Sequence, residues 1–298
     1  MSEPAAAATG RRLPTVSVIV ATRNRARYLE RMLDALLGDD YPEMEVIVVD
    51  GASSDGTVNL LKSYGNRIAR WVSEPDDGEY FAYNKALGIA SGEIIKPMSD
   101  DDVLRPGAIR RAAEYLAEHP DVDIVFGQAA FWDEREGVAF LYATTEMIEA
   151  SRITLRGLIR GRSGVCSLAA FVRRRLFDRI GSWSTRYSCG DVEFWARAIA
   201  NGAKIGLIPD VVVDYHFTGS NGAMRMQPRL RLDLVRLNVL YGTPRDVVGA
   251  IAQLFHECLW KFWLRLLNRA CQAMGLQPMR MLRRWWRWAR PTPHPRTR

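Results

Sequence analysis

Short runs of apolar, mostly β-branched residues alternate along this chain with segments in which apolar residues recur at helical spacing. The runs at residues 15–21 and 45–50, and a weaker one at 68–73, have the length and composition of buried parallel strands. Helical spacing follows the first two runs, at residues 28–37 and 58–64. Strands that alternate with helices predict an α/β fold built on a parallel sheet.

Polar residues stand where these predicted strands end. They are Thr22, Asn24, Asp50, Asp76 and the stretch 99–102, which follows a further apolar run at 93–98. Ligands of open α/β sheets bind outside the carboxyl ends of the strands. We therefore expect these residues to share one polar site.

Three consecutive carboxylates, Asp100, Asp101 and Asp102, are the most informative part of that site. Adjacent carboxylates repel one another unless a cation lies among them, and Mg²⁺ or Mn²⁺ is commonly held by carboxylates together with substrate phosphates. The alternative is a helix N-terminus, where aspartates favour the dipole and Pro106 would lie in the first turn. The strand–helix pattern upstream favours the metal–phosphate interpretation.

Five motifs carry a resemblance to a known family. They read VSVIVATRNR at 16–25, EVIVVDGASSDGT at 45–57, SEPD at 73–76 with Asn84 and Lys85, SDDDVL at 99–104 and GDVEFWAR at 190–197. In this order they resemble the inverting family-2 glycosyltransferases over residues 14–220. The resemblance implies a GT-A-type, Rossmann-like fold, in which helices flank a mixed, mostly parallel sheet, and a UDP-, dTDP- or GDP-sugar donor.

The same resemblance implies how the donor and a metal ion would be bound. The nucleoside would contact Thr22, Asn24 and Asp50, its base or ribose would lie near Asp76, and other parts of the donor would lie beside Asn84, Lys85 and Asp100. A Mn²⁺ or Mg²⁺ ion, which neutralises the departing diphosphate, would be bound by Asp101, Asp102 and His216.

Two positions depart from the family's pattern. Ser99 stands where the metal motif often begins with Asp or Asn, so a metal held by Asp100 and Asp102 is an alternative register. Residues 167–174 stand where many relatives carry a His-Gln pair, which leaves the acceptor pocket unassigned.

Asp191 is the candidate general base, because an inverting transfer needs one carboxylate to take the proton of the acceptor hydroxyl. It opens a predicted helix at 191–201, so capping of that helix is the structural alternative, and the two roles are compatible. His216 ends a predicted strand at 208–215, before a glycine-rich loop, where it could serve the metal or be purely structural.

Composition agrees with a globular enzyme of 298 residues, 48% hydrophobic and 25% charged. The four cysteines contain no Cys-x-x-Cys pair, which argues against zinc and a disulfide framework and favours a reducing cytoplasm. Residues 1–13 are alanine-rich and are expected to be a disordered lead. The chain has no run of eighteen or more uncharged apolar residues, so no membrane-spanning helix is expected.

The net charge of +7 belongs to the C-terminal part of the chain. Residues 256–298 contain ten Lys or Arg and one acid, Glu257, together with five of the nine tryptophans. Helical periodicity is present at 246–269, which could pack on the catalytic domain, and at 280–289, where arginines face Leu and Trp. Such basic, aromatic helices bind anionic membranes. Dimerisation is an alternative, and the nearly neutral body argues against nucleic acid as a partner.

These observations predict a disordered lead at 1–13, a catalytic domain at 14–220 with donor (14–104) and acceptor (105–220) halves, a helical extension at 221–275 and a basic tail at 276–298. We expect a peripheral enzyme at the inner face of the cell membrane, with a lipid-linked or nascent polysaccharide acceptor. The Gln-x-x-Arg-Trp motif of processive synthases is missing, which favours one transfer per encounter. A nucleotidyltransferase and a non-catalytic membrane scaffold are the alternatives.

Overall fold

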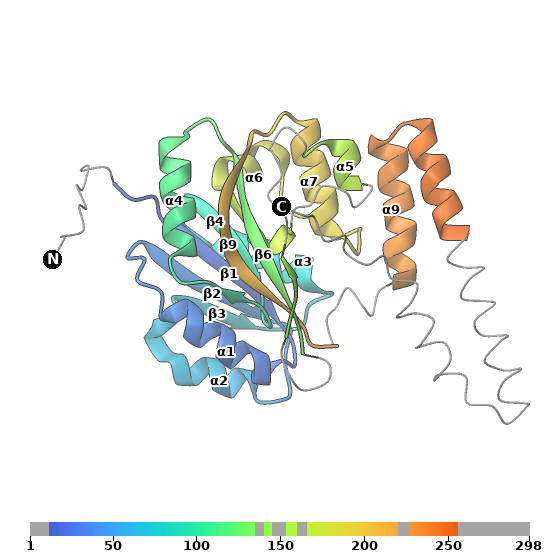
Figure 1. The fold of residues 1–298 in the computed structure, drawn as a ribbon. Coiled ribbons are helices and arrows are strands. Elements are labelled where there is room, and N and C mark those ends of the chain that lie inside the picture. Colours follow the sequence, from blue (N-terminus) through green and yellow to red (C-terminus); the bar gives the residue numbers. More distant parts are fainter. Residues whose placement is uncertain (1–11, 135–139, 145–152, 160–165, 220–226, 256–298) are drawn as a thin grey trace, which may run out of the picture. The chain divides into compact units, whose positions relative to one another are not determined.

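The computed structural model describes residues 12–134, 140–144, 153–159, 166–219 and 227–255. Its contacts divide the chain into two units, Met1–Thr243 and Pro244–Arg298. The first unit is a sheet with helices on both faces (Figure 1), and the second is represented by a helix over residues 244–255. Most of the expected lead, and all of the expected basic tail at 276–298, lie outside the described residues.

The N-terminal half of the sheet is parallel, as its sequence pattern predicts. Strand β1 (Val16–Thr22) pairs with β2 (Met44–Asp50) on one side and with β4 (Ile94–Ser99) on the other, and β2 pairs with β3 (Arg70–Ser73). The register sets Thr22 beside Asp50 and Asp50 beside Ser73. The polar residues that end these strands therefore meet at one edge of the sheet.

The C-terminal half of the sheet is mixed. Strand β8 (Ala170–Arg173) runs antiparallel to β4 and to β6 (Ile124–Asp133). Strand β9 (Ile205–Phe217) is parallel to β6, while β5 (Val103–Leu104) and β7 (Phe140–Thr144) pair antiparallel with β9 and β6. The resulting nine-stranded sheet has the order β3-β2-β1-β4-β8-β6-β9-β5, with β7 beside β6. This confirms the expected mixed, mostly parallel α/β sheet.

Helices cover both faces of this sheet. One layer contains α1 (Ala26–Leu37), α2 (Thr57–Tyr64) and α4 (Ala108–Glu118); the other contains α3 (Glu79–Ile89), α5 (Leu155–Ile159), α6 (Arg174–Ile180), α7 (Gly190–Ala200) and α9 (Gln227–Tyr241). Two 3₁₀ turns, η1 (Gly65–Arg67) and η3 (Ser167–Ala169), are also present among the residues that the structure describes. Helix α9 packs its leucines into the same cluster as α7, although the sequence pattern placed residues 221–275 in a separate extension. No helix in the described part of the chain is long and apolar enough to cross a bilayer.

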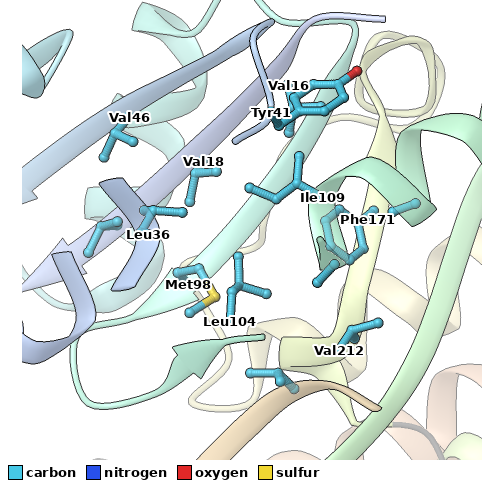
Figure 2. Packing of buried hydrophobic residues seen from close by; sticks show 14 of the residues in the cluster. Val16, Val18, Leu36, Tyr41, Val46, Met98, Leu104, Ile109, Phe171 and Val212 are labelled. Atoms are coloured by element: carbon cyan, nitrogen blue, oxygen red, sulfur yellow. The ribbon is translucent and has the colours of Figure 1, made fainter. Parts of the chain in front are cut away.

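Side-chain alternation along β1 builds a core on each face of the sheet. Val16, Val18 and Val20 pack with the layer of α1, α2 and α4, whereas Ile19 packs with the layer of α3 and α7. Figure 2 shows the first of these clusters, in which Met98 and Leu104 extend the packing from β1 towards α4. Because both faces are buried, the strands are nearly continuous apolar runs.

Two close contacts hold the donor half of the sheet to its neighbours. The backbone N–H of Gly92 donates to Ser17 Oγ at 2.7 Å, and a Cβ at Gly92 would lie 2.5 Å from the Ser17 backbone nitrogen. On α3, the Asn84 side chain donates to the Trp183 carbonyl at 2.8 Å and accepts from the Trp183 N–H at 3.0 Å. Trp183 itself is buried among aromatic rings that include Phe177 and Phe194.

The approach at Gly92 predicts that Gly92→Ala destabilises the protein, because the new methyl group meets backbone atoms that cannot move aside. We expect a loss of about 1–3 kcal/mol in the free energy of unfolding, measured by urea denaturation. Gly88→Ala is the matched control: its Cβ meets no atom within 4 Å, and an alanine in α3 should stabilise by about 0.5–1 kcal/mol. Equal midpoints for the two variants would contradict the packing described here.

The contacts of Asn84 predict that Asn84→Ala lowers the free energy of unfolding by roughly 1–3 kcal/mol, because two backbone groups of Trp183 lose their partners. The neighbouring Lys85→Ala removes a partly exposed ion pair with Glu74 and should change stability by less than about 1 kcal/mol. Urea denaturation of both variants tests this difference. An Asn84 variant as stable as the wild type would show that the Trp183 contact contributes little.

Candidate functional site

Asp50 is fixed at the floor of the site where β2 ends. Its side chain is fully buried, and its Oδ2 accepts hydrogen bonds from the Ser53 N–H at 3.0 Å and the Ser73 hydroxyl at 2.6 Å. Its Oδ1 accepts from the Ser53 hydroxyl. A carboxylate offers about four acceptor positions, so a donor group of a ligand can still be accommodated.

The turns that follow β1 and β2 are joined through Asn24. Its Oδ1 accepts from the Ser54 N–H at 2.8 Å, and its own N–H donates to Ser53 Oγ at 2.6 Å. Asn24 has a φ of 54°, a left-handed conformation that asparagine tolerates better than most residues. These contacts make Asn24 a connector of the two turns.

Asp76 lies directly against the turn after β2. A Cβ at Gly51 would lie 3.0 Å from Asp76 Oδ2 and 3.1 Å from its Oδ1, so glycine leaves the space that this carboxylate occupies. The Gly78 N–H donates to Asp76 Oδ1 at 3.0 Å. The structure therefore brings Asp76 to the same turn as Asp50.

Asn84 and Lys85 lie on α3 and use their polar groups elsewhere. Asn84 binds the Trp183 backbone, and Lys85 forms an ion pair with Glu74. Their expected contact with a donor stays a prediction.

The acidic turn after β4 is bound by residues of the turn after β1. Asp100 Oδ2 accepts from Thr22 Oγ1 at 2.8 Å, and its Oδ1 accepts from Arg25 Nε at 3.1 Å. The second nitrogen group of Arg25 forms an ion pair with Asp101. Burial raises the pKa of Asp100 to about 6, although Arg25 acts in the opposite direction. Arg25 is thus the positive charge that the structure places at this turn, and the strand-end pattern did not single it out.

Asp102 is the most deeply buried of the three carboxylates. Its Oδ1 accepts from the His216 N–H at 2.8 Å, whereas its Oδ2 is buried and has no hydrogen-bond partner among the residues that the structure describes. Burial, together with the charge of Asp101, raises its pKa well above the ordinary value.

A buried lysine lies below this turn. Lys96 donates to the carbonyls of Leu168 and Pro97, and its Nζ lies 5.0 Å from the centre of the Phe171 ring. Burial lowers its pKa to about 7, while the charge of Asp102 acts in the opposite direction. Lys96 is the one charged residue inside the strand β4, which is the signal by which the sequence could have revealed it.

His216 is oriented by a carboxylate at the end of β6. Its Nδ1 lies 2.7 Å from Glu134 Oε1, and Glu134 also pairs with Arg31 at 2.8 Å. Burial and the charge of Arg31 lower the pKa of His216. Because a carboxylate accepts at Nδ1, the neutral ring carries its proton there and presents Nε2 as the basic nitrogen, an arrangement common in metal-binding histidines.

The carboxylates at residues 100–102 are of the ligand type that a hard divalent ion prefers. Carboxylate oxygens are the preferred ligands of Mg²⁺ and Mn²⁺, and substrate phosphates usually supply part of the coordination. Asp102 Oδ2 is a buried acceptor with a coordination position to fill. Within the described ranges, however, no three His, Cys, Asp or Glu side chains are grouped as a complete ligand set.

Asp191 lies in the first turn of α7 and is held from the donor half. The Tyr80 hydroxyl donates to Asp191 Oδ1 at 3.0 Å. A Cβ at Gly190 would lie 2.9 Å from the Tyr80 ring, so glycine allows this ring to lie on the start of α7. Tyr80 is a site residue that sequence patterns did not indicate, because its partner is 111 positions away.

Glu79 is an exposed residue in the first turn of α3. Neighbouring protein atoms partly desolvate its carboxylate, which raises its pKa. A hydrogen bond with Tyr83 lowers this pKa, and the charges of Asp191, Asp100 and Asp101 raise it. Acidic groups from both halves of the domain therefore contribute to the electrostatic surroundings of Glu79.

Comparison with solved structures identifies proteins that share this fold. The structure of *Staphylococcus aureus* TarS in complex with UDP-GlcNAc superposes with a TM-score of 0.61 at 21% identity, covering 81% of this chain and 71% of TarS. The mannosyltransferase PcManGT from *Pyrobaculum calidifontis*, in complex with GDP-Man and Mn²⁺, superposes with a TM-score of 0.59 at 23% identity, covering 95% of this chain and 82% of that protein. These similarities support the GT-A-type fold.

Sequence comparison gives the family. A PGL/p-HBAD biosynthesis glycosyltransferase of *Mycobacterium bovis* is 27% identical over 205 residues, which cover 67% of this chain and 75% of that protein. GlyG, a glycosyltransferase of *Streptococcus pneumoniae*, is 25% identical over 152 residues, half of each chain. The sequence profile of Glycosyl transferase family 2 matches residues 17–181, more than half of the chain. The protein therefore belongs to glycosyl transferase family 2.

Proposed function

We propose that this glycosyltransferase uses a divalent metal ion to transfer a sugar from a nucleoside diphosphate to an acceptor hydroxyl, with inversion at the anomeric carbon. The observation that carries this proposal is that Thr22 binds Asp100 beside Asp50 at one edge of the sheet, while Tyr80 of α3 binds Asp191 of the other half. Inverting transfer needs acidic groups on both sides of the sugar: one side for the leaving diphosphate and one for the incoming hydroxyl.

The donor side would bind the nucleotide through the ends of β1 and β2. Asp50 would accept hydrogen bonds from the base or ribose. Asp76, which lies against Gly51, would line the same part of the donor site. The ligands bound to the two structural relatives, UDP-GlcNAc and GDP-Man, support a nucleoside-diphosphate-sugar donor. Asp101, Asp102 and His216 would hold the ion, which when bound neutralises charge on the departing diphosphate.

The acceptor side would use Asp191 as the general base. Its carboxylate takes the proton of the acceptor hydroxyl while the hydroxyl oxygen forms a bond to the anomeric carbon. The bond from that carbon to the diphosphate breaks at the same time, and its electron pair leaves with the diphosphate. The Tyr80 hydroxyl, bound to Asp191 Oδ1, would orient the carboxylate so that its other oxygen faces the acceptor.

The proposal predicts that purified protein with Mn²⁺ releases nucleoside diphosphate from at least one sugar nucleotide in a panel of UDP-, dTDP- and GDP-sugars. Asp191→Asn should lower kcat by at least about 10²-fold, because it removes the group that accepts the proton. The Kd for nucleoside diphosphate, measured by calorimetry, should stay within about threefold of the wild type, since Asp191 lies on the acceptor side.

Two further variants make this test specific. Tyr80→Phe keeps the ring against Gly190 but removes the hydrogen bond, and should lower kcat by less than Asp191→Asn while shifting the pH–rate profile. Asp121→Asn, at a largely exposed ion pair with Lys204, is the control with unchanged kcat and Kd. Loss of nucleotide binding in Asp191→Asn would move this residue to the donor pocket. No turnover of any donor, with or without lipid extract, would favour a non-catalytic scaffold.

We also propose that the acceptor is a lipid-linked or nascent polysaccharide chain and that residues 276–298 bring the enzyme to an anionic membrane surface. Support comes from the ten basic residues and five tryptophans at 256–298. Deletion of 278–298 should abolish co-sedimentation with vesicles that contain anionic lipid, and leave hydrolysis of a soluble donor unchanged. Vesicle binding that persists after the deletion, or that does not weaken with added salt, would contradict this role.

A further inference from the structure

Arg25 forms ion pairs with two carboxylates of the acidic turn, Asp100 and Asp101. The residue follows β1 and precedes α1, and its side chain is 14% exposed. Its guanidinium binds Asp100 through Nε at 3.1 Å and Asp101 Oδ2 through a second nitrogen, and it lies over the Tyr28 ring at 4.4 Å. One side chain therefore bridges two adjacent carboxylates, which would otherwise repel each other.

Part of the negative charge of this turn is compensated by the chain's own residues. Arg25 binds Asp100 and Asp101 from the site, and the buried Lys96 acts on Asp102 from the core side. In the donor-free enzyme Asp100 and Asp101 are therefore already paired with a cation. A divalent ion that approaches Asp101 Oδ2 meets a guanidinium already bound to that oxygen.

We propose that Arg25 and the divalent ion compete for Asp101, so that Arg25 holds the acidic turn closed in the donor-free enzyme and releases it when the ion arrives with a diphosphate. This inference rests on the proposed metal-dependent function. An ion binds carboxylate oxygen at about 2.0–2.2 Å, and a guanidinium nitrogen at about 2.7–2.9 Å. If the ion and the guanidinium both bound Asp101 Oδ2, a divalent and a monovalent cation would lie in contact and repel each other.

The diphosphate resolves this conflict because it carries the missing negative charge. An arginine that leaves a carboxylate can bind phosphate oxygens with the same planar fork of donors. The two ligands would then favour each other's binding. The ion would displace Arg25 from Asp101, and Arg25 would bind the diphosphate instead. Linkage requires that each ligand raises the affinity for the other by the same factor.

The test measures Mn²⁺ binding and not turnover. Free Mn²⁺ is followed by electron paramagnetic resonance in titrations of the full chain, with and without UDP or GDP. In the absence of nucleotide, Arg25→Gln should bind Mn²⁺ about tenfold more tightly than the wild type, because the competing charge has gone. Nucleotide should strengthen Mn²⁺ binding strongly in the wild type and only weakly in Arg25→Gln.

Arg27→Gln is the matched control. It removes the same charge two positions along the chain, where the side chain is exposed and lies over the Tyr28 ring at 5.8 Å. Its Mn²⁺ affinity should stay close to that of the wild type, which separates competition for a carboxylate from a general change in net charge. If Arg25→Gln folds poorly, Arg25→Lys, which keeps the charge but loses the fork, should give intermediate Mn²⁺ affinity and coupling.

Unchanged or weaker Mn²⁺ binding by Arg25→Gln overturns the competition, and so does an equal gain in Arg27→Gln. Absence of Mn²⁺ binding in every variant, even with UDP or GDP, overturns both the competition and the proposed metal dependence. Tighter Mn²⁺ binding by Arg25→Gln in a protein that turns over no donor would support the competition and count against the proposed transferase reaction. The two proposals therefore fail on different measurements.

Discussion

Repulsion among the three carboxylates at 100–102 is the constraint around which the site is built. The sheet brings this turn to the edge where β1 and β2 also end, so that Thr22 and Arg25 can bind Asp100 directly. On the far side, the His216 N–H binds Asp102 because β9 pairs with β5, the strand that directly follows Asp102. Each of these groups compensates charge that the turn would otherwise hold unopposed in a poorly hydrated place.

Helix α3 joins the two halves of the catalytic domain. Asn84 binds the backbone of Trp183, and Tyr80 binds Asp191 at the start of α7. Since both contacts come from one helix, a shift of α3 would move the proposed base together with the wall of the donor pocket. The spacing between leaving group and attacking hydroxyl would then be set by a rigid element and not by a loop, which favours precise positioning.

The parallel half of the fold and the edge that carries the site were predictable from the sequence. Apolar, β-branched runs with helical segments between them are a local signal, and the position of Asp50 after such a run was enough to place it. The partners of the site residues were not predictable in this way. Arg25 meets Asp101 across 76 positions, and Tyr80 meets Asp191 across 111, so each pair depends on the order of strands in the completed sheet.

The C-terminal boundary was harder to predict for a related reason. The sequence pattern assigns residues 221–275 to a helical extension, and only the packed structure shows that Leu237 of α9 joins the cluster that contains Phe194. Lys96 was not singled out from the sequence, although a single charge inside the apolar strand β4 is a signal that could have revealed it.

The burial of Lys96 makes alkaline conditions favourable for this part of the fold. An unfolded lysine keeps a pKa near 10.5, whereas the folded one has a pKa of about 7, so the unfolded chain binds more protons between these values. Stability that arises from this residue therefore increases as the pH rises from 7 to 10.5, and its full penalty is present below pH 7. Burial of Lys96 therefore destabilises β4 most in acid. Burial of Asp102 has the opposite pH dependence, because its raised pKa favours the folded state when the carboxyl group is protonated.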